Sequence, residues 1–257
     1  MAAPRFAVTK VPKALRTLAI DVGGTGLKAS VLDAEGRMLV KRRRVPTPHP
    51  CRPATLLRAL EELTTPLPAC DRISVGFPGV VRDGRVITAP HFDGKAWRGY
   101  PLAKALSRRF GKPVRMLNDA EVQGLGIIEG CGLEVVLTLG TGVGSAVFRD
   151  GRPTPHLELS RHPIRKGKTY DDYIGNNARR AHSTKKWSRR VLRAVRVVYA
   201  LLHYDRVYLG GGNADKLVCD LPPNVRIASN KAGITGGIRL WSDDVWQVAH
   251  TRAPVVR

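Results

Sequence analysis

The chain has 257 residues, 43% of them hydrophobic, which suits one large domain or two of about 100 to 130 residues. It has no apolar run of the roughly 20 residues that a membrane-spanning helix needs, and its basic start lacks the continuous apolar stretch of a signal peptide. The formal net charge of +22 predicts attraction to a polyanion, whether nucleic acid, an acidic membrane surface or polyphosphate, and does not choose among them.

The four cysteines stand singly in the sequence, without CxxC or CxC spacing. They are Cys51, Cys70, Cys131 and Cys219. We therefore expect no disulfides and no structural zinc site, and this cysteine usage fits a reducing cytoplasm. Residues 1–16 predict a flexible N-terminal tail.

The first ordered element predicted is a β-hairpin over residues 18–33, with two apolar strands around a turn of glycines and a threonine. Residues 135–150 repeat this pattern. Such glycine turns let backbone N–H groups converge on a phosphate oxygen. One glycine-rich hairpin alone is commonly structural. The repetition, with Asp21 entering the first turn and Thr25 and Thr141 inside the turns, favours two hairpins that grip one phosphate chain from both sides.

The segment between the hairpins predicts alternating helices and strands. Its patterns indicate a third strand over 37–45 that carries the basic run at 41–44, a helix over 54–63 and a buried strand over 72–77. A short hairpin and loop over 80–97, a helix over 101–110, a strand over 114–119 and a helix over 120–130 follow. The last of these strands ends on Asn118 and Asp119. Because open α/β sheets bind ligands where their strands end, we expect Asp119 to face a cleft.

The second half continues from the repeated hairpin into a strongly basic region. Residues 161–196 carry 12 Lys or Arg against two acids, Asp171 and Asp172. Within this region, residues 185–203 predict a helix with one apolar face and one positively charged face. A strand over 206–209 ends on three glycines, and a short strand over 225–228 and a helix over 232–241 follow.

Six motifs occur in an order that resembles the ROK family of sugar kinases. They are Asp21-Val-Gly-Gly-Thr25, GFPGV at 76–80, Leu117-Asn-Asp-Ala120, LGTGVG at 139–144, Glu158-Leu159 and Leu209-Gly-Gly-Gly212. The resemblance covers roughly residues 17 to 241. TGLK after the first glycines, PGVVRDGRVITA and SNKAGITGG are most similar to the polyphosphate glucokinase branch.

The resemblance implies an α/β fold with two domains of the actin-like ATPase (ribonuclease H-like) type and a cleft between them. We place these domains at residues 17–119 and 120–257. It also implies phosphoryl transfer from polyphosphate, ATP or both to the 6-hydroxyl of a hexose, with glucose as the first candidate and Mg²⁺ assisting. We expect a homodimer.

The resemblance also implies residue roles. Asp119 would be the general base, and a positioned carboxylate helps a poorly nucleophilic hydroxyl to attack phosphorus; the alternative for Asn-Asp at a strand end is a helix N-cap. The other implied site residues are Gly79, His91, Asn118, Glu158 and His162 for the sugar, Gly23, Gly24, Thr25, Lys28, Gly140, Thr141 and Gly142 for phosphate, Gly211 and Gly212 beside the nucleotide, and Asp21 for Mg²⁺ through water. Glu158 could instead be a solvated loop acid, and His162 could be bonded locally.

The chain departs from the family pattern at three places. It lacks the cysteine-rich zinc knot, Arg161 stands where a histidine usually follows Glu-Leu-Gly, and His91 stands where an asparagine often contacts the sugar. These departures leave the identity of the hexose open. Mannose and amino sugars are the alternatives to glucose.

The basic residues allow two interpretations. They would line a track for polyphosphate, or the helix stripe is a solvated face. The track residues are Arg161, Arg165, Lys166, Lys168, Lys185, Arg189 and Arg193. A second hypothesis is a ROK-like sensor or nucleic-acid-binding protein. It is not favoured, because 16 residues before the first strand are too few for a helix-turn-helix domain and the 6% of aromatic residues are not interleaved with the basic runs.

Overall fold

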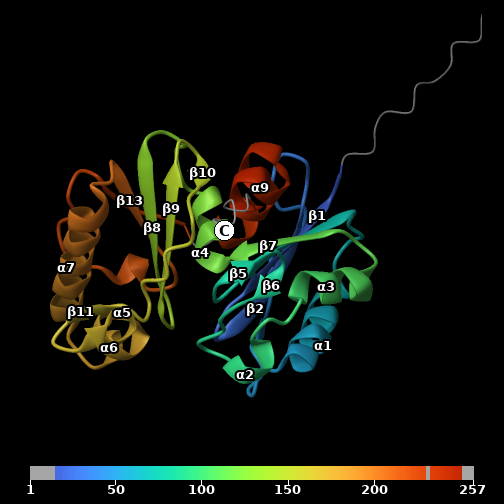
Figure 1. Cartoon of the computed structure of the whole chain (residues 1–257), viewed down its shortest axis with the longest axis horizontal. Helices are drawn as coiled ribbons and strands as arrows, with labels where there is room; N and C mark the ends of the chain where they lie inside the picture. Colours follow the sequence, from blue (N-terminus) through green and yellow to red (C-terminus); the bar gives the residue numbers. More distant parts are fainter. Residues whose placement is uncertain (1–14, 230–231, 251–257) are drawn as a thin grey trace, which may run out of the picture.

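The computed structural model describes residues 15–229 and 232–250, so residues 1–14 of the expected tail lie outside the described part. The chain forms two α/β halves, each built on a five-stranded sheet (Figure 1). None of the helices in the described ranges has the length and apolar character needed to cross a bilayer.

The first sheet has the strand order β3-β2-β1-β4-β7. Its strands are β1 (Thr17–Val22), β2 (Gly26–Leu32), β3 (Arg43–Pro46), β4 (Arg72–Phe77) and β7 (Val114–Asn118). The first hairpin is antiparallel, whereas β1, β4 and β7 run parallel. Leucines of α1 (Pro53–Thr64) and α3 (Leu102–Phe110) pack on one face of the sheet, where they bury Leu18 and Ile20.

The second sheet repeats this topology with the order β10-β9-β8-β13-β14. Its strands are β8 (Leu133–Leu139), β9 (Val143–Arg149), β10 (Arg152–Pro153), β13 (Arg206–Gly210) and β14 (Val225–Ile227). An antiparallel hairpin is again followed by parallel pairing. The long helix α7 (Thr184–Leu202) buries Trp187, Val191 and Val198 against this sheet, as its periodicity predicts, and leaves Lys185 and Arg189 exposed.

Helix α4 (Asp119–Leu125) lies between the two sheets. Its residues share a core with β8, β9 and β13, and Asp119 and Val122 also lie against Gly76 of β4. The helix is shorter than the predicted 120–130, because its chain leaves helical hydrogen bonding at Gly126. Asp119 is therefore carried by the element that joins the halves.

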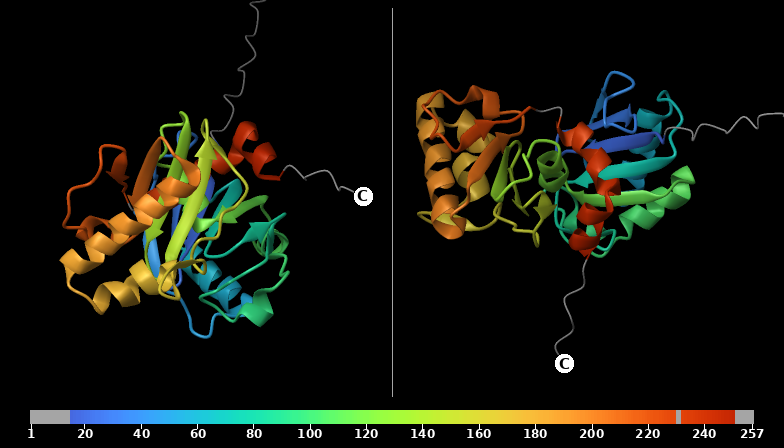
Figure 2. Two further views of the ribbon diagram at one scale, coloured as in Figure 1. Left: turned by 60° about the vertical axis from the view of Figure 1, so that its left-hand side comes forward. Right: turned by 90° about the horizontal axis from the view of Figure 1, so that it is seen from above.

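The C-terminal elements return to the first sheet, although the sequence places them with the second half. They are α8 (Ala232–Thr235), η2 (Gly236–Trp241) and α9 (Asp243–His250). Ser74 Oγ donates to Gly237 O over 2.6 Å, and Arg115 donates to Leu240 O over 2.8 Å. Figure 2 shows these elements, in red, beside the blue and green strands of the first sheet. The boundary at residue 119 remains a prediction.

Short elements complete the described structure. They are β5 (Val81–Arg82), β6 (Arg85–Val86), α2 (Gly94–Trp97), β11 (Pro163–Arg165), β12 (Lys168–Thr169), α5 (Tyr170–Ile174), α6 (Asn176–Arg180) and η1 (Ala214–Lys216). The predicted loop over 156–175 thus contains a small hairpin and a helical turn. The predicted helix over 232–241 is split into an α-helical and a 3-10 turn where Gly236 and Gly237 pack closely on their neighbours.

Candidate active site

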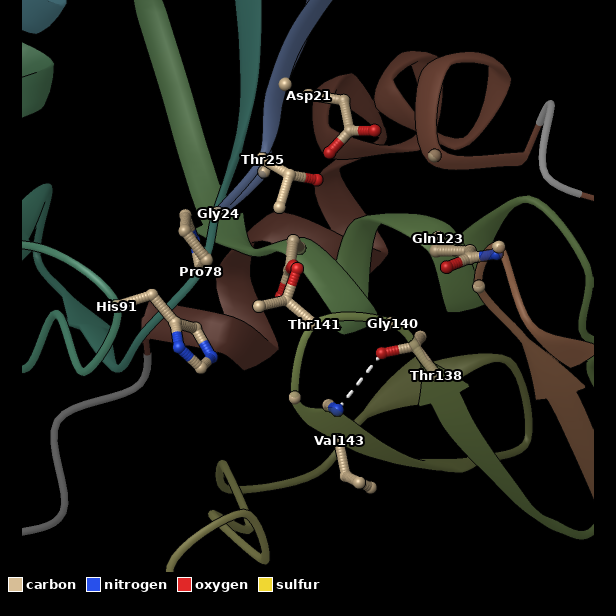
Figure 3. Close-up of a pocket in the computed structure, with 18 of the residues that line it drawn as sticks. Asp21, Gly24, Thr25, Pro78, His91, Gln123, Thr138, Gly140, Thr141 and Val143 are labelled. Carbon is tan, nitrogen blue, oxygen red and sulfur yellow. Dashed lines mark hydrogen bonds between the residues drawn. The ribbon is translucent and has the colours of Figure 1, made fainter. Parts of the chain in front are cut away.

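A cavity of about 570 Å³ lies between the halves and is lined by residues from both (Figure 3). Most of the residues predicted from the sequence line this cavity. They are Asp21, Gly23, Gly24, Thr25, Lys28, Gly79, His91, Asn118, Asp119, Gly140, Thr141, Gly142, Glu158, Gly211 and Gly212. The long-range fold therefore brings together motifs that are far apart in the chain.

The first hairpin turn is held tightly by its own backbone. Gly23 N donates to Gly26 O over 3.1 Å, and Thr47 Oγ1 donates to Gly23 O over 2.6 Å. A Cβ on Gly23 would lie only 2.9 Å from Gly26 O, so the turn requires glycine there. On the adjoining strands, Lys28 Nζ is paired with Asp21 Oδ2 at 2.6 Å.

The second turn faces the first across the cavity. Gly140 N donates to Gly142 O over 3.0 Å, and Val143 N donates to Asp171 Oδ1 over 2.7 Å. A Cβ built on Gly24 would lie 3.7 Å from Thr141 Oγ1, which places the two turns in direct proximity. Figure 3 shows Gly24 and Thr25 on one side and Thr141 on the other. Two loops of glycines and threonines therefore face the same space.

Asp119 is the first residue of α4, and the cap of that helix is Asn118. Asn118 Oδ1 accepts from Ala120 N at 2.9 Å, while Asn118 Nδ2 donates to Gly79 O over 3.1 Å. The capping role that the sequence left open thus belongs to Asn118, and the carboxyl of Asp119 reaches the cavity. Burial, the negative charge of Asp21 and that of Glu158 raise the pKa of Asp119 to about 7.

Glu158 belongs to a polar cluster that the sequence reasoning missed. His156 lies between Glu158 and Glu121, with Nδ1 2.8 Å from Glu121 Oε1 and Nε2 3.5 Å from Glu158 Oε2. Burial alone would raise the pKa of Glu158, but hydrogen bonds from His156 and Ser160 outweigh it and keep the pKa low. A sequence signal exists, since the spacing of His156 and Glu158 puts both side chains on one side of an extended segment.

Eight further polar residues line the cavity but were not predicted as site residues. The cavity lining also includes Arg42, Arg44, Gln123, Thr138, Ser160, Asn176, Arg180 and Asn213, which the sequence did not single out. The basic run at residues 41–44 was predicted on a strand over 37–45, and the structure has a shorter strand, β3 (Arg43–Pro46), paired with β2 beside the first turn. Arg44 lies against Gly26 of that turn, where a Cβ would come within 2.8 Å of Arg44 Nε.

Other predicted residues lie outside the cavity lining in the described part of the chain. His162 is exposed and lies near the Tyr170 ring, 6.3 Å between centroids. The seven predicted track residues are also exposed and do not line the cavity. Lys185, Arg189 and Arg193 lie along α7, at the far side of the second half from the first sheet (Figure 1).

The residues at the cavity fit a phosphate-bound Mg²⁺ better than a protein-caged metal. Within residues 15–229 and 232–250 no group of three or more His, Cys, Asp and Glu side chains could hold a metal ion. Asp21 and Asp119 nevertheless face one cavity closely enough for the charge of Asp21 to affect the pKa of Asp119. Mg²⁺ commonly binds through one or two carboxylates, water and substrate phosphates, and the carboxylates of Asp21 and Asp119 fit this preference.

Comparisons with known proteins show the family to which the chain is related. A family model described as the ROK family matches residues 17–155. A polyphosphate glucokinase of Mycobacterium tuberculosis (strain H37Ra) is 31% identical over 234 residues, covering 84% of this chain and 88% of that protein. An inorganic polyphosphate/ATP-glucomannokinase from Arthrobacter has a TM-score of 0.80 at 31% identity, covering 87% of this chain and 97% of its own.

A more distant solved structure has the same fold. A ROK family glucokinase from Streptomyces griseus, solved with glucose and AMPPNP, has a TM-score of 0.72 at 20% identity and covers 88% of this chain and 98% of its own. The predicted fold class, two actin-like (ribonuclease H-like) domains, is confirmed by these neighbours.

Proposed function

The chain belongs to the ROK family of sugar kinases, and on that premise we propose that it transfers a phosphoryl group from polyphosphate, ATP or both to the 6-hydroxyl of a hexose, with glucose as the first candidate. One observation carries this proposal most strongly. Two glycine-threonine turns from different halves face each other over a cavity that also holds the carboxyl of Asp119. Named relatives that use polyphosphate support the choice of donor.

In the proposed mechanism, the residues that line the cavity have separate roles. Asp119 accepts the proton of the attacking hydroxyl, for which a pKa near neutrality suits a general base. Asn118 and Glu158 orient the sugar, with Gly79 and His91 beside them. Backbone N–H groups of the two turns other than those of Gly23, Gly140 and Val143, together with Lys28, hold the donor phosphates, because phosphoryl transfer depends mainly on positioning and charge stabilisation.

We assign Mg²⁺ to Asp21, held through water. When bound, the ion would neutralise charge on the donor phosphates. The side chain of Asp21 is mostly buried and one of its oxygens is paired with Lys28, so its position is set before any ion binds. Gly211 and Gly212 would border a nucleotide; Gly211 has φ +83 and a Cβ there would overlap Leu139, whereas a Cβ on Gly212 would meet open space.

Two exposed arginines line the cavity, one from each half. Arg44 from the first half and Arg180 from the second line it and are exposed to solvent. Two residues after Arg180, the pKa of His182 is lowered by desolvation and by the positive charges of Arg190, Lys186 and Lys168, so the surface around His182 is positively charged. We propose that a long donor leaves the cavity at Arg180 and continues over this surface toward Lys185 and Arg189.

Charge removal along this path is expected to affect polyphosphate more than ATP. Arg44→Ala and Arg180→Ala are expected to raise KM for polyphosphate about five- to tenfold at low salt, and the effect should shrink as salt rises. Steady-state kinetics with both donors measures this. Arg58→Ala, an exposed arginine of α1 outside the cavity lining, is the matched control. Equal effects of all three variants on KM would contradict the proposed path.

Activity is expected to fall in acid, because the base must be ionised to accept a proton. With a pKa of about 7 for Asp119, kcat/KM for the hexose should rise about tenfold per pH unit below neutrality and level off above it. Initial rates in buffers of constant ionic strength measure this profile. A flat profile between about pH 5 and 8, with the enzyme folded throughout, contradicts the assignment of the base.

A grid of donors against acceptors tests the proposed function itself. Polyphosphate and ATP are each paired with glucose, mannose and amino sugars. Transfer to a hexose from either donor supports the kinase, and the preferred pair identifies donor and sugar. No transfer with any pair, together with tight, salt-sensitive DNA binding, would favour the alternative of a non-catalytic polyanion-binding protein. The homodimer remains a prediction that light scattering can check.

A further inference from the structure

One buried histidine has no role in the mechanism above. The side chain of His156 is 15% exposed and lies between two carboxylates, Glu121 and Glu158. Glu121 is in the first turn of α4, the helix that begins at Asp119. Glu158 is in the irregular segment after β10 and lines the cavity. The histidine therefore connects the helix of the proposed base with the segment of a proposed sugar ligand.

Each carboxylate already has one oxygen bonded to a backbone N–H. Glu121 Oε2 accepts from Asn118 N at 3.0 Å, which closes the capping box of α4. Glu158 Oε1 accepts from Ser160 N at 3.1 Å. The other oxygen of each carboxylate faces the imidazole of His156. Apart from His156, the described hydrogen bonds of Glu158 come from Ser160, which is only two residues away in the same irregular segment.

The two contacts of His156 are unequal. Nδ1 is at hydrogen-bond distance from Glu121, whereas Nε2 is at ion-pair distance from Glu158 and has no closer partner among the described residues. An imidazole can donate to both carboxylates only when both nitrogens carry protons. Burial lowers the pKa of His156, but the hydrogen bonds and charges of Glu121 and Glu158 outweigh burial and raise it to about 9.

We propose that His156 is a positioning residue that links Glu158 to helix α4. The link fixes the proposed sugar ligand, Glu158, relative to the proposed base, Asp119. The inference rests on the proposed function, in which Glu158 binds the sugar. A ligand on an irregular segment needs such support, because a displacement of about 1 Å at a reacting group can cost on the order of a hundredfold in rate. Because Asn118 is the cap of the same helix turn, the link reaches both proposed sugar ligands.

Conservative substitutions separate this role from a general effect on folding. In His156→Gln the amide N–H can replace the Nε2 donor toward Glu158, whereas in His156→Asn it can replace only the Nδ1 donor toward Glu121. His156→Ala removes both. All three variants lose the charge, so differences among them report the geometry of the link. His203→Asn, an exposed histidine at the end of α7, is the matched control.

Hexose binding measured by calorimetry without donor, together with KM for each substrate, tests the inference. We expect His156→Ala and His156→Asn to weaken hexose binding at least about tenfold, and His156→Gln to stay within about threefold of the unaltered protein. KM for the donor should change less than about twofold in all variants. Thermal unfolding of each variant shows whether it is folded, and the Asn and Gln variants keep the test decisive if the Ala variant does not fold.

Two outcomes overturn the inference. If the folded Asn variant binds hexose as tightly as the unaltered protein, or if Asn preserves binding better than Gln, His156 does not position Glu158. In either case the proposed function stands if the unaltered protein phosphorylates the sugar. If the unaltered protein neither binds nor phosphorylates any hexose, the proposed function fails and the inference fails with it.

Discussion

Asp119→Asn is expected to lower kcat for hexose phosphorylation by about 10²- to 10⁴-fold, the range typical of a lost general base. The amide keeps the shape of the carboxyl and can still accept from Ala120 N, a contact that Asp119 Oδ1 makes at 2.9 Å, but it cannot take the proton of the hydroxyl. Single-turnover and steady-state rates measure the loss. Hexose binding by calorimetry should change little, because in the proposed mechanism Asn118 and Glu158 orient the sugar.

Thermal unfolding supplies the control for this variant. The pKa of Asp119 in the folded protein, about 7, is raised well above the usual value of an aspartate, so the folded protein favours the protonated form. The stability linked to this group is fully present below the unfolded pKa and is lost as pH rises through about 7. At about pH 8 the Tm of the Asp119→Asn protein should therefore be no lower than the Tm of the unaltered protein. Retained turnover in a folded Asp119→Asn protein would remove Asp119 as the base.

Gly236→Ala is expected to have the largest effect on stability. A Cβ at Gly236 would lie 2.0 Å from Val122 O and 2.9 Å from Gly126 N. Both are backbone atoms, the first within α4 and the second at its C-cap. Backbone cannot swing aside as a flexible side chain can, so η2 must move away from α4. Overpacking of this kind costs about 1–3 kcal/mol or more, which lowers Tm by about 2–4 °C per kcal/mol in a chain of this size.

The same substitution should also reduce activity, because α4 begins with Asp119 and lies between the two sheets. Differential scanning calorimetry and initial rates measured well below Tm separate the two effects. Gly94→Ala is the matched control, since the nearest atom to its added Cβ would be Ala89 O at 3.9 Å and its backbone does not need positive φ. A Gly236→Ala protein as stable as the Gly94→Ala protein would show that α4 and η2 are not packed this closely.

Local elements were largely predictable. The hairpins β1–β2 and β8–β9, the strand β4 and the helix α7 are confirmed nearly residue for residue. Each has a strong apolar period and, in the hairpins, a glycine turn between strands that pair with their neighbour in the chain. Errors occur where glycine weakens the pattern, as at the end of α4 and in the segment over 232–241.

Much of the cavity lining was also predictable, because its glycines, Asn118 and Asp119 stand at the ends of recognisable strands. Arg44 and Arg180 were not, since a basic residue in a chain of net charge +22 carries no signal of its own. Their positions depend on how β3 and α6 are placed around the two turns. The basic residues of α7 are the opposite case. Their alignment along one helix face was evident from the sequence, but only the structure shows that they lie outside the cavity lining.

The sequence by itself determined the two glycine-threonine turns, the amphipathic helices and the strand that ends next to Asp119, because these features depend on neighbouring residues and on side-chain periods. Only the tertiary structure decided that Gly24 lies near Thr141, that Gly236 packs on Val122, and that His156 lies between Glu121 and Glu158. These pairs join distant parts of the chain, and their proximity follows from how two sheets and α4 pack together. No local pattern encodes such packing, since it is the sum of many weak apolar contacts over the whole core.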